Sequence, residues 1–240
     1  MIVLGIESST AQVGCALGGH EGVLASFHAA RGRRHAEILV PAVAFVCEQA
    51  DVKLAEVGVI AVDIGPGLFT GLRVGVATAK ALAQALRVPM VGMSSLDLLA
   101  YPVRFTRRLI AAVIDARRGE VFWALYRQVP GGVQRVSEPV VTTAEEVAAD
   151  LEARGEECLL VGDGARRYAE VFARLSHVEP AGAGTAYPSA GALVELAHPR
   201  ALREQFVWPW ELEPLYLRPV DADPSWDRRL VPHRSGGTEG

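Results

Sequence analysis

The residues whose types and spacing best suit ligand binding lie in a glycine-rich segment, DIGPGLFTGLRVG, at positions 63–75. An apolar run, VGVIAV, precedes it, and an Ala-rich run, VATAKALAQAL, follows it. A glycine-rich turn between a strand and a helix can present backbone N–H groups to a phosphate. A P-loop, however, needs lysine after its final glycine, and Leu72 and Arg73 stand there instead. The segment does not match a P-loop.

The chemistry that remains in this segment is that of a stiff turn. Pro66 fixes one φ angle, and Gly65 and Gly67 permit backbone angles that other residues avoid. Thr70 is expected to cap the helix that follows. We therefore predict a loop that positions a helix, made of these residues: Gly65, Pro66, Gly67, Phe69, Thr70 and Gly71.

Two acidic turns could clamp a phosphate and its metal ion. The first reads Glu7-Ser8-Ser9-Thr10, and the second carries Asp115. A carboxylate in such a turn can hold Mg²⁺ through water. The second turn reads DARRGE, with bulky arginines where a phosphate loop needs glycine or threonine. We favour hairpin-turn residues over an active clamp, and both interpretations stay open.

Histidine and cysteine spacing predicts no metal site. The six histidines form no HxxxH or HxxEH pair, and no Ser-His-Asp arrangement can be assembled from spacing. The three cysteines are far apart and form no CxxC motif. We therefore expect no disulfide and no thiolate zinc site, which fits a reducing cytoplasm.

The elements that would position these residues occur as a repeated pattern. Three β-type runs near the start are followed by a helix at about 35–50, a strand at 57–64 and a second helix at about 70–86. The same order of strands and helices begins again near residue 108, so the unit βββαβα appears twice. Thr143 is expected to cap the first helix of the second unit, and Pro199 to end a further helix at 189–202.

This repeat predicts an α/β protein with two lobes, each a mixed β-sheet flanked by helices. The first lobe would span 1–102, with 203–222 returning to it, and the second would span 103–202. Residues 223–240 lack an apolar period and are expected to form a mobile tail. Actin/Hsp70-type ATPases have this two-lobed plan and clamp phosphate between turns of the two lobes, which adds an ATPase to the candidate functions.

The second helix carries small residues every four positions. Gly71, Gly75, Ala79 and Ala83 would form a shallow groove along one side. Such a groove allows another helix to approach closely, and a mid-helix glycine costs about 0.5–1 kcal/mol unless something compensates. The groove could pack inside its own lobe. We favour a contact with a second chain.

Composition limits the candidate functions. The net charge is −4, half of the residues are hydrophobic and 22% are charged, so the whole chain does not attract nucleic acid. No apolar stretch reaches the roughly 18–20 residues that a membrane crossing needs, and we expect no signal peptide from the first residues. Paired arginines such as Arg117/Arg118 could meet a phosphate, but a solvated face is the simpler interpretation.

The chain resembles a known family in five stretches between residues 2 and 219. They read VLGIESST, RRHAEILVPAV, GPGLFTGLRVG, IDARRGEVFWALY and EPLYLRP, and they follow the order of the TsaB (YeaZ) family. This resemblance implies a duplicated ribonuclease-H-like fold of the actin/Hsp70 (ASKHA) type. It also implies a degenerate paralogue of TsaD, the subunit that transfers a threonylcarbamoyl group to tRNA. The family often has Asp where this chain has Glu7, which weakens the ATPase interpretation.

The resemblance further implies a non-catalytic subunit. Its partners would be TsaD, the ATPase TsaE and a second copy of itself, with tRNA reached only through the complex. ATP, ADP and Mg²⁺ would belong to partner subunits, and this chain would hold no cofactor. The implied contacts use the first two helices, and the expected interface residues are His35, Ile38, Leu39, Ala42, Val43, Val46, Leu72, Arg73, Gly75, Val76, Ala79, Lys80 and Ala83. An independent ATPase and, less favoured, a glycoprotease-type metallopeptidase are the alternatives.

Overall fold

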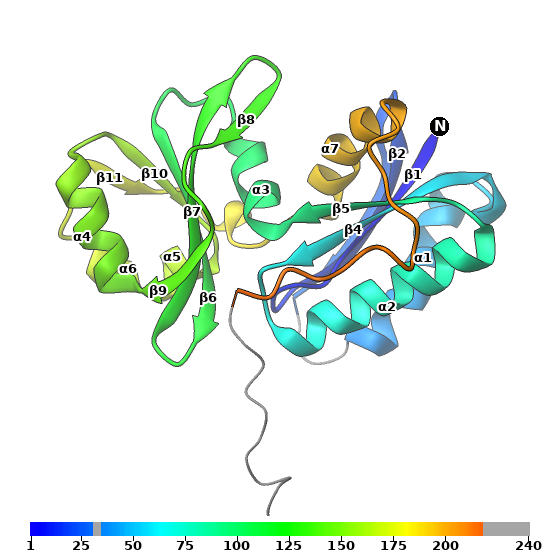
Figure 1. Ribbon diagram of the computed structural model, residues 1–240, viewed down its shortest axis with the longest axis horizontal. Helices are drawn as coiled ribbons and strands as arrows, with labels where there is room; N and C mark the ends of the chain where they lie inside the picture. The colour runs from blue at the N-terminus through cyan, green and yellow to red at the C-terminus, as the bar shows by residue number, and fades with distance from the viewer. Residues whose placement is uncertain (31–34, 218–240) are drawn as a thin grey trace, which may run out of the picture.

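The computed structural model describes residues 1–30 and 35–217, and these form two α/β lobes side by side (Figure 1). The predicted tail, 223–240, and residues 218–222 of the predicted returning segment lie outside the described residues. None of the helices in the described part is long and apolar enough to cross a membrane. The predicted fold class is confirmed by the two sheets described below.

The first lobe is built on a five-stranded mixed sheet with the order β3-β2-β1-β4-β5. Its strands are β1 (Ile2–Glu7), β2 (Val13–Gly19), β3 (Gly22–Ala29), β4 (Val57–Gly65) and β5 (Met90–Ser94). Strands β1, β2 and β3 pair antiparallel, whereas β4 is parallel to both β1 and β5. This arrangement brings the carboxyl ends of β1 and β4, and the turns that follow them, to the same edge of the sheet.

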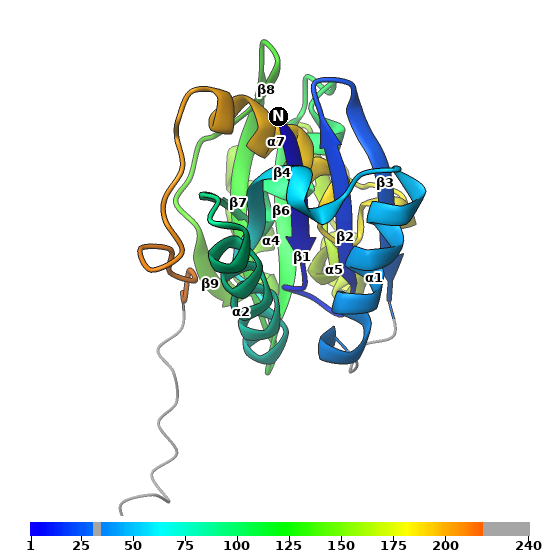
Figure 2. The same ribbon diagram turned by 90° about the vertical axis from the view of Figure 1, so that its right-hand side faces the viewer.

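Both faces of the first sheet are covered. Helices α1 (His35–Gln49) and α2 (Phe69–Leu86) pack on one face, and α7 (Ala190–Leu202) packs on the other (Figures 1 and 2). The 3-10 turn η1 (Leu54–Glu56) leads into β4. Because the sheet is buried on both sides, β1 is an almost uninterrupted hydrophobic run.

The second lobe repeats the plan with a sheet ordered β11-β10-β6-β7-β8, in which β9 also pairs with β7. Its strands are β6 (Leu109–Arg117), β7 (Glu120–Val129), β8 (Gly132–Arg135), β9 (Val140–Thr143), β10 (Cys158–Val161) and β11 (Val178–Pro180). Its helices are α4 (Ala144–Arg154), α5 (Asp163–Arg167) and α6 (Ala169–Phe172), with η3 (Ala183–Thr185) after β11. Helix α3 (Ser95–Ala100) and η2 (Tyr101–Val103) connect the two lobes and contact strands of both.

The position of α7 differs from the prediction, which placed it in the second lobe. Its Leu193, Val194 and Ala197 join one buried cluster with Val3 and Val59 of the first sheet. The first sheet has an apolar second face that needs cover, and α7 supplies it. The chain therefore returns to the first lobe at residue 190, earlier than the predicted residue 203.

The segment after α7 stays on the first lobe. Val207 forms an antiparallel bridge with Met90 of the edge strand β5, and the N–H of Leu215 donates to the carbonyl of Ile64 at 2.7 Å. Leu212 is buried in the core beneath α1 and α2. Figure 2 shows this segment running down one edge of the molecule.

Three local predictions can be compared with the structure. Thr143 caps α4 as predicted, and its hydroxyl accepts from the N–H of Glu146 at 3.2 Å. Thr70 lies inside α2, where the N-cap is Leu68 without a side-chain cap, so that prediction is wrong. Pro199 does not end α7, which continues to Leu202.

Candidate functional site

The glycine-rich loop lies directly against the first acidic turn. The N–H of Leu68 donates to the carbonyl of Ser9 at 2.6 Å, and the Ser8 hydroxyl donates to the carbonyl of Gly71 at 2.8 Å. A Cβ atom on Gly67 would lie 2.2 Å from the Ser9 carbonyl oxygen, which is closer than any side chain allows. Glycine is needed here because two backbone segments touch. These contacts give the loop the role of holding α2 against the end of β1.

The small residues of α2 serve the packing of its own lobe. A Cβ atom on Gly75 would lie 2.1 Å from the Ser8 Oγ, and Ala79 and Ala83 have no exposed surface. The prediction that this stripe meets a second chain is therefore wrong. The compensation for a mid-helix glycine is the close approach of α2 to its own sheet.

Most of the predicted interface residues are likewise buried within the lobe. The buried ones are His35, Leu39, Ala42, Val43, Val46, Leu72, Gly75, Val76, Ala79 and Ala83. Only Ile38, Arg73 and Lys80 keep part of their surface exposed. The apolar period identified the side of each helix that faces the sheet, which is the opposite of the side that a partner could reach.

The outer faces of α1 and α2 carry apolar residues that the sequence reasoning missed. On α1, Val40 is 63% exposed, Phe45 is 46% exposed and Ala44 is exposed too, while the Phe45 ring also contacts Phe27 of β3. On α2, Ala77 and Ala81 are exposed. The two helices contact each other and lie side by side on the surface of the lobe (Figure 2). We call these five exposed residues the outer helix surface. Their signal in the sequence is apolar residues where an amphipathic helix would carry charge.

The first acidic turn is buried and occupied by its own hydrogen bonds. The side chains of Glu7, Ser8, Ser9 and Thr10 have almost no exposed surface. Glu7 Oε1 accepts from both the N–H and the hydroxyl of Ser9 at 2.8 Å. Burial, together with the nearby Asp63 carboxylate, raises the pKa of Glu7 well above its ordinary value. The polar groups of this turn that could bind a phosphate are therefore buried, away from solvent.

Asp63 is a buried acid that the sequence reasoning did not single out. It lies near the end of β4, and its Oδ1 accepts from the N–H of Gly65 at 2.8 Å and from the Ser95 hydroxyl at 2.6 Å. Burial raises its pKa to about 6. The available signal was an acid at the end of an apolar strand, immediately before the glycine-rich loop.

The second acidic turn pairs its carboxylate with arginine. Asp115 Oδ1 accepts from the N–H of Arg117 at 3.0 Å, Oδ2 accepts from its guanidinium at 2.9 Å, and Arg167 lies 3.6 Å away. The backbone N–H of Asp115 donates to Asp163 Oδ1 at 3.0 Å, and burial raises the pKa of Asp163 to about 6. These residues line a hollow of about 430 Å³ together with Ala11 of the first turn. An internal guanidinium therefore takes the position next to Asp115 that a cation would need.

No cluster in the described residues has the make-up of a metal centre. No group of three or more histidine, cysteine, aspartate or glutamate side chains is arranged to hold an ion there. His35, which begins α1, is buried, and its Nε2 has no hydrogen-bond partner in the described chain. Burial lowers the pKa of this imidazole.

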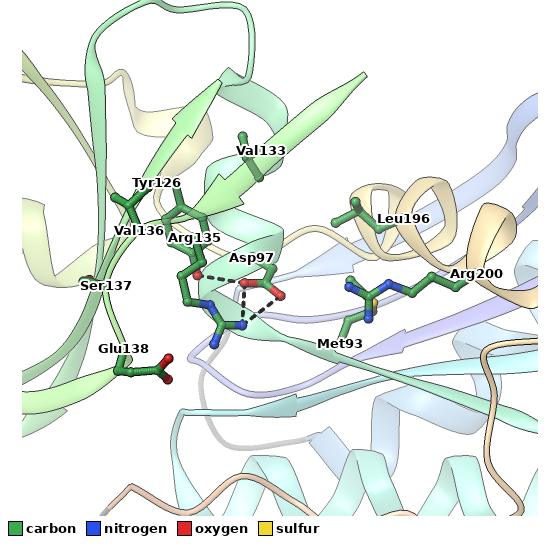
Figure 3. Close-up of a pocket in the computed structure, with 10 residues that line it drawn as sticks. All are labelled: Met93, Asp97, Tyr126, Val133, Arg135, Val136, Ser137, Glu138, Leu196 and Arg200. Carbon is green, nitrogen blue, oxygen red and sulfur yellow. Dashed lines mark hydrogen bonds and ion pairs between the residues drawn. The ribbon is translucent and has the colours of Figure 1, made fainter. Parts of the chain in front are cut away.

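A second hollow lies between the lobes, away from both acidic turns. It measures about 540 Å³ and is lined by residues of β5, α3 and α7 from one side and of β7, β8 and the segment after β8 from the other (Figure 3). Asp97 at its centre accepts from the Tyr126 hydroxyl at 2.8 Å and from Arg135 at 3.0 Å. These bonds join α3 to the second sheet. No sequence signal pointed to this hollow.

Comparison with known proteins agrees with this architecture. The model of the family TsaD: tRNA N6-adenosine threonylcarbamoyltransferase matches residues 23–225. A solved structure of YeaZ from Pseudomonas aeruginosa superposes with a TM-score of 0.78 at 30% identity, covering 90% of this chain and 99% of that one. The two-lobed ribonuclease-H-like plan is therefore shared over nearly the whole described chain.

Curated relatives point to the same branch. The Bacillus subtilis tRNA threonylcarbamoyladenosine biosynthesis protein TsaB is 35% identical over 136 residues, which are 57% of this chain and 59% of that protein. An uncharacterized Mycobacterium leprae protein is 36% identical over 227 residues, 93% of this chain and 56% of that protein. The chain thus spans somewhat more than half the length of these two relatives. It belongs to the TsaD family, in the TsaB (YeaZ) branch, and the recognised resemblance is confirmed.

Proposed function

We propose that the chain is a non-catalytic subunit in tRNA threonylcarbamoyladenosine biosynthesis. It pairs with a TsaD-type transferase and, together with the ATPase TsaE, supports threonylcarbamoyl transfer to the tRNA adenosine next to the anticodon. The observation that carries this proposal is the outer helix surface, a set of exposed apolar side chains on two adjacent helices. The names of its TsaB and YeaZ relatives give the pathway.

The outer helix surface has the composition of a docking site. Val40 and Phe45 expose large apolar side chains, and the small Ala77 and Ala81 would let a partner helix approach α2 closely. Covering such a surface contributes about 25 cal/mol per Å² of apolar area, before the costs of association. The same surface would serve a second copy of this chain when the transferase is absent.

The acidic turns support a role without catalysis. Glu7 is enclosed and bonded to Ser9, while Asp115 is bonded to Arg117. A working phosphate clamp needs carboxylates and N–H groups that face an open cleft. In this proposal ATP, ADP and Mg²⁺ are held by the partner subunits, and tRNA meets the complex rather than this chain alone.

The test places charge on the outer helix surface. The double variant Val40→Glu/Phe45→Glu should lose co-purification with TsaD while its circular dichroism spectrum and melting temperature stay close to those of the unmodified chain. Phe105→Glu is the matched control, because Phe105 is 77% exposed and follows η2, in the connection between the two lobes.

Two outcomes decide the proposal. TsaD binding that survives in Val40→Glu/Phe45→Glu would reject this surface as the interface. In a mixture of the chain, TsaD, TsaE and tRNA, modification should stop when the chain is left out. Undiminished modification without it would reject the subunit role.

An ATPase of the actin/Hsp70 class is the second candidate, favoured by one observation. Asp115, Asp163 and Ala11 bring parts of both lobes to one hollow, as phosphate clamps do. Calorimetry with ATP and Mg²⁺ separates the candidates: micromolar binding that is lost in Asp115→Ala, but kept in Asp150→Ala on the half-buried acid of α4, would favour the enzyme. No feature of the described residues favours the metallopeptidase alternative.

A further inference from the structure

The hollow shown in Figure 3 is lined by apolar and charged side chains contributed by both lobes. Met93 of β5 and Leu196 of α7 come from the first lobe, and Val133 of β8 comes from the second lobe. Its volume of about 540 Å³ falls within the range of roughly 300–1,000 Å³ that is usual for small-molecule sites. The hollow takes no part in the outer helix surface or in the acidic turns.

One charge in this hollow is already balanced. Asp97 accepts from Arg135 Nη2 at 3.0 and 3.3 Å and from the Tyr126 hydroxyl at 2.8 Å. Burial and the neighbouring Asp97 raise the pKa of Tyr126, so its hydroxyl remains a donor. Both bonds from Arg135 to Asp97 use the same guanidinium nitrogen, and the guanidinium also interacts with the Tyr126 hydroxyl.

Arg200 supplies a second, unmatched positive charge. It projects from α7 into the hollow toward Asp97 and Arg135 (Figure 3). Within residues 1–30 and 35–217 the structure shows no ion pair or hydrogen bond of its guanidinium. A guanidinium above the apolar Met93 and Leu196 is suited to a planar acid whose body is hydrophobic, since its donors match a carboxylate in pairs.

We propose that this hollow binds a small monocarboxylate. Its carboxylate bonds to Arg200 and to N–H groups of Arg135 that do not meet Asp97, and its apolar body lies among Met93, Leu196 and Val133. A doubly charged phosphate fits less well, because Asp97 and Glu138 line the same hollow and repel further negative charge. A bound acid bridges the two lobes, since Arg135 and Arg200 come from opposite walls. The proposal is independent of the partner-subunit function.

The test uses the isolated full chain and pentanoate as the probe. Chemical-shift titration should show saturable pentanoate binding, with shifts at Met93 and Leu196. Pentanamide, which lacks the charge, and inorganic phosphate should bind at least about 10-fold more weakly. Arg200→Gln should weaken pentanoate binding about 10-fold or more, the effect of losing one charge-assisted hydrogen-bond pair.

Arg203→Gln is the control, because Arg203 follows the same helix but does not line the hollow. It should bind pentanoate like the unmodified chain, and the circular dichroism spectra of both variants should be unchanged. Equal binding by Arg200→Gln, equal binding of pentanamide, or the absence of saturable shifts up to about 20 mM pentanoate would each overturn the proposal. Preferential phosphate binding would overturn the monocarboxylate assignment.

Discussion

At the scale of single residues, the first turn is a buried structural centre. Glu7 and Asp63 are both enclosed acids, and Ser9 and Ser95 satisfy one oxygen of each. Their second oxygens, Glu7 Oε2 and Asp63 Oδ2, have no hydrogen-bond partner in the described residues. An ionised carboxylate is costly in such surroundings, so the protonated form is favoured there.

The raised pKa of Asp63 predicts a pH dependence of stability. Because the folded-state pKa is about 6 and lies above the ordinary value, the folded chain holds this proton more tightly than the unfolded chain does. The stabilisation that Asp63 contributes is therefore complete below its ordinary pKa, near 4, and is lost as the pH rises to about 6. Asp63→Asn should flatten that fall by on the order of 2–3 kcal/mol, measured by urea unfolding between pH 4.5 and 8.

Asp51→Asn is the control for this measurement, because Asp51 is exposed after α1. Its stability should follow the pH as that of the unmodified chain does. A pH profile of Asp63→Asn that coincides with the unmodified one would show that Asp63 carries no raised pKa.

At the scale of elements, α2 is held by contacts that only glycine permits. Gly67, Gly71 and Gly75 bring the loop and the helix onto Ser8 and Ser9, so the segment with the strongest motif signal acts through packing. The helix is therefore placed by the end of β1, and its outer face is left for other contacts.

Gly75→Ala should lower the free energy of unfolding by about 1–3 kcal/mol, because the added methyl group would lie 2.1 Å from the Ser8 Oγ. Removing that oxygen makes room, so Ser8→Ala/Gly75→Ala should lose less stability than the sum of the two single variants. Urea denaturation of all four proteins gives the coupling energy. Strict additivity would mean that the two side chains do not clash.

At the scale of the whole molecule, the chain crosses between lobes more than once. It leaves the first lobe through α3, builds the second sheet, and returns with α7 and the segment to Leu217. The returning segment contributes Leu212 to the first core, and Leu217 packs against the apolar cluster between α3 and the second sheet. The core of the first lobe is thus complete only when the segment from α7 to Leu217 packs against the N-terminal strands and helices.

Leu212→Ala should therefore destabilise the first lobe, although Leu212 is far in sequence from the strands and helices that it packs against. A buried leucine truncated to alanine costs about 2–5 kcal/mol. Thermal unfolding followed by circular dichroism should show this loss, whereas Glu213→Ala, on the exposed neighbour, should change little. Equal melting temperatures for the two variants would show that the returning segment adds no stability.

The sequence by itself determined the repeated order of strands and helices, the two-lobed fold class and the family. These follow from local periodicity and from motifs such as GPGLFTG, in which glycine and proline set the backbone angles of a tight turn. The family resemblance and the small residues of α2 also led us to expect a partner at α1 and α2, which stays a prediction.

Only the tertiary structure decided which side of those helices is free. Periodicity marks an apolar stripe, and Leu39, Val43 and Ala79 proved to face their own sheet. It also decided where α7 packs and which charged side chains meet between the lobes, since Asp97, Arg135 and Arg200 are distant in sequence. Local patterns carry no information about such distances: burial and charge pairing depend on how both sheets and their covering helices close around each other.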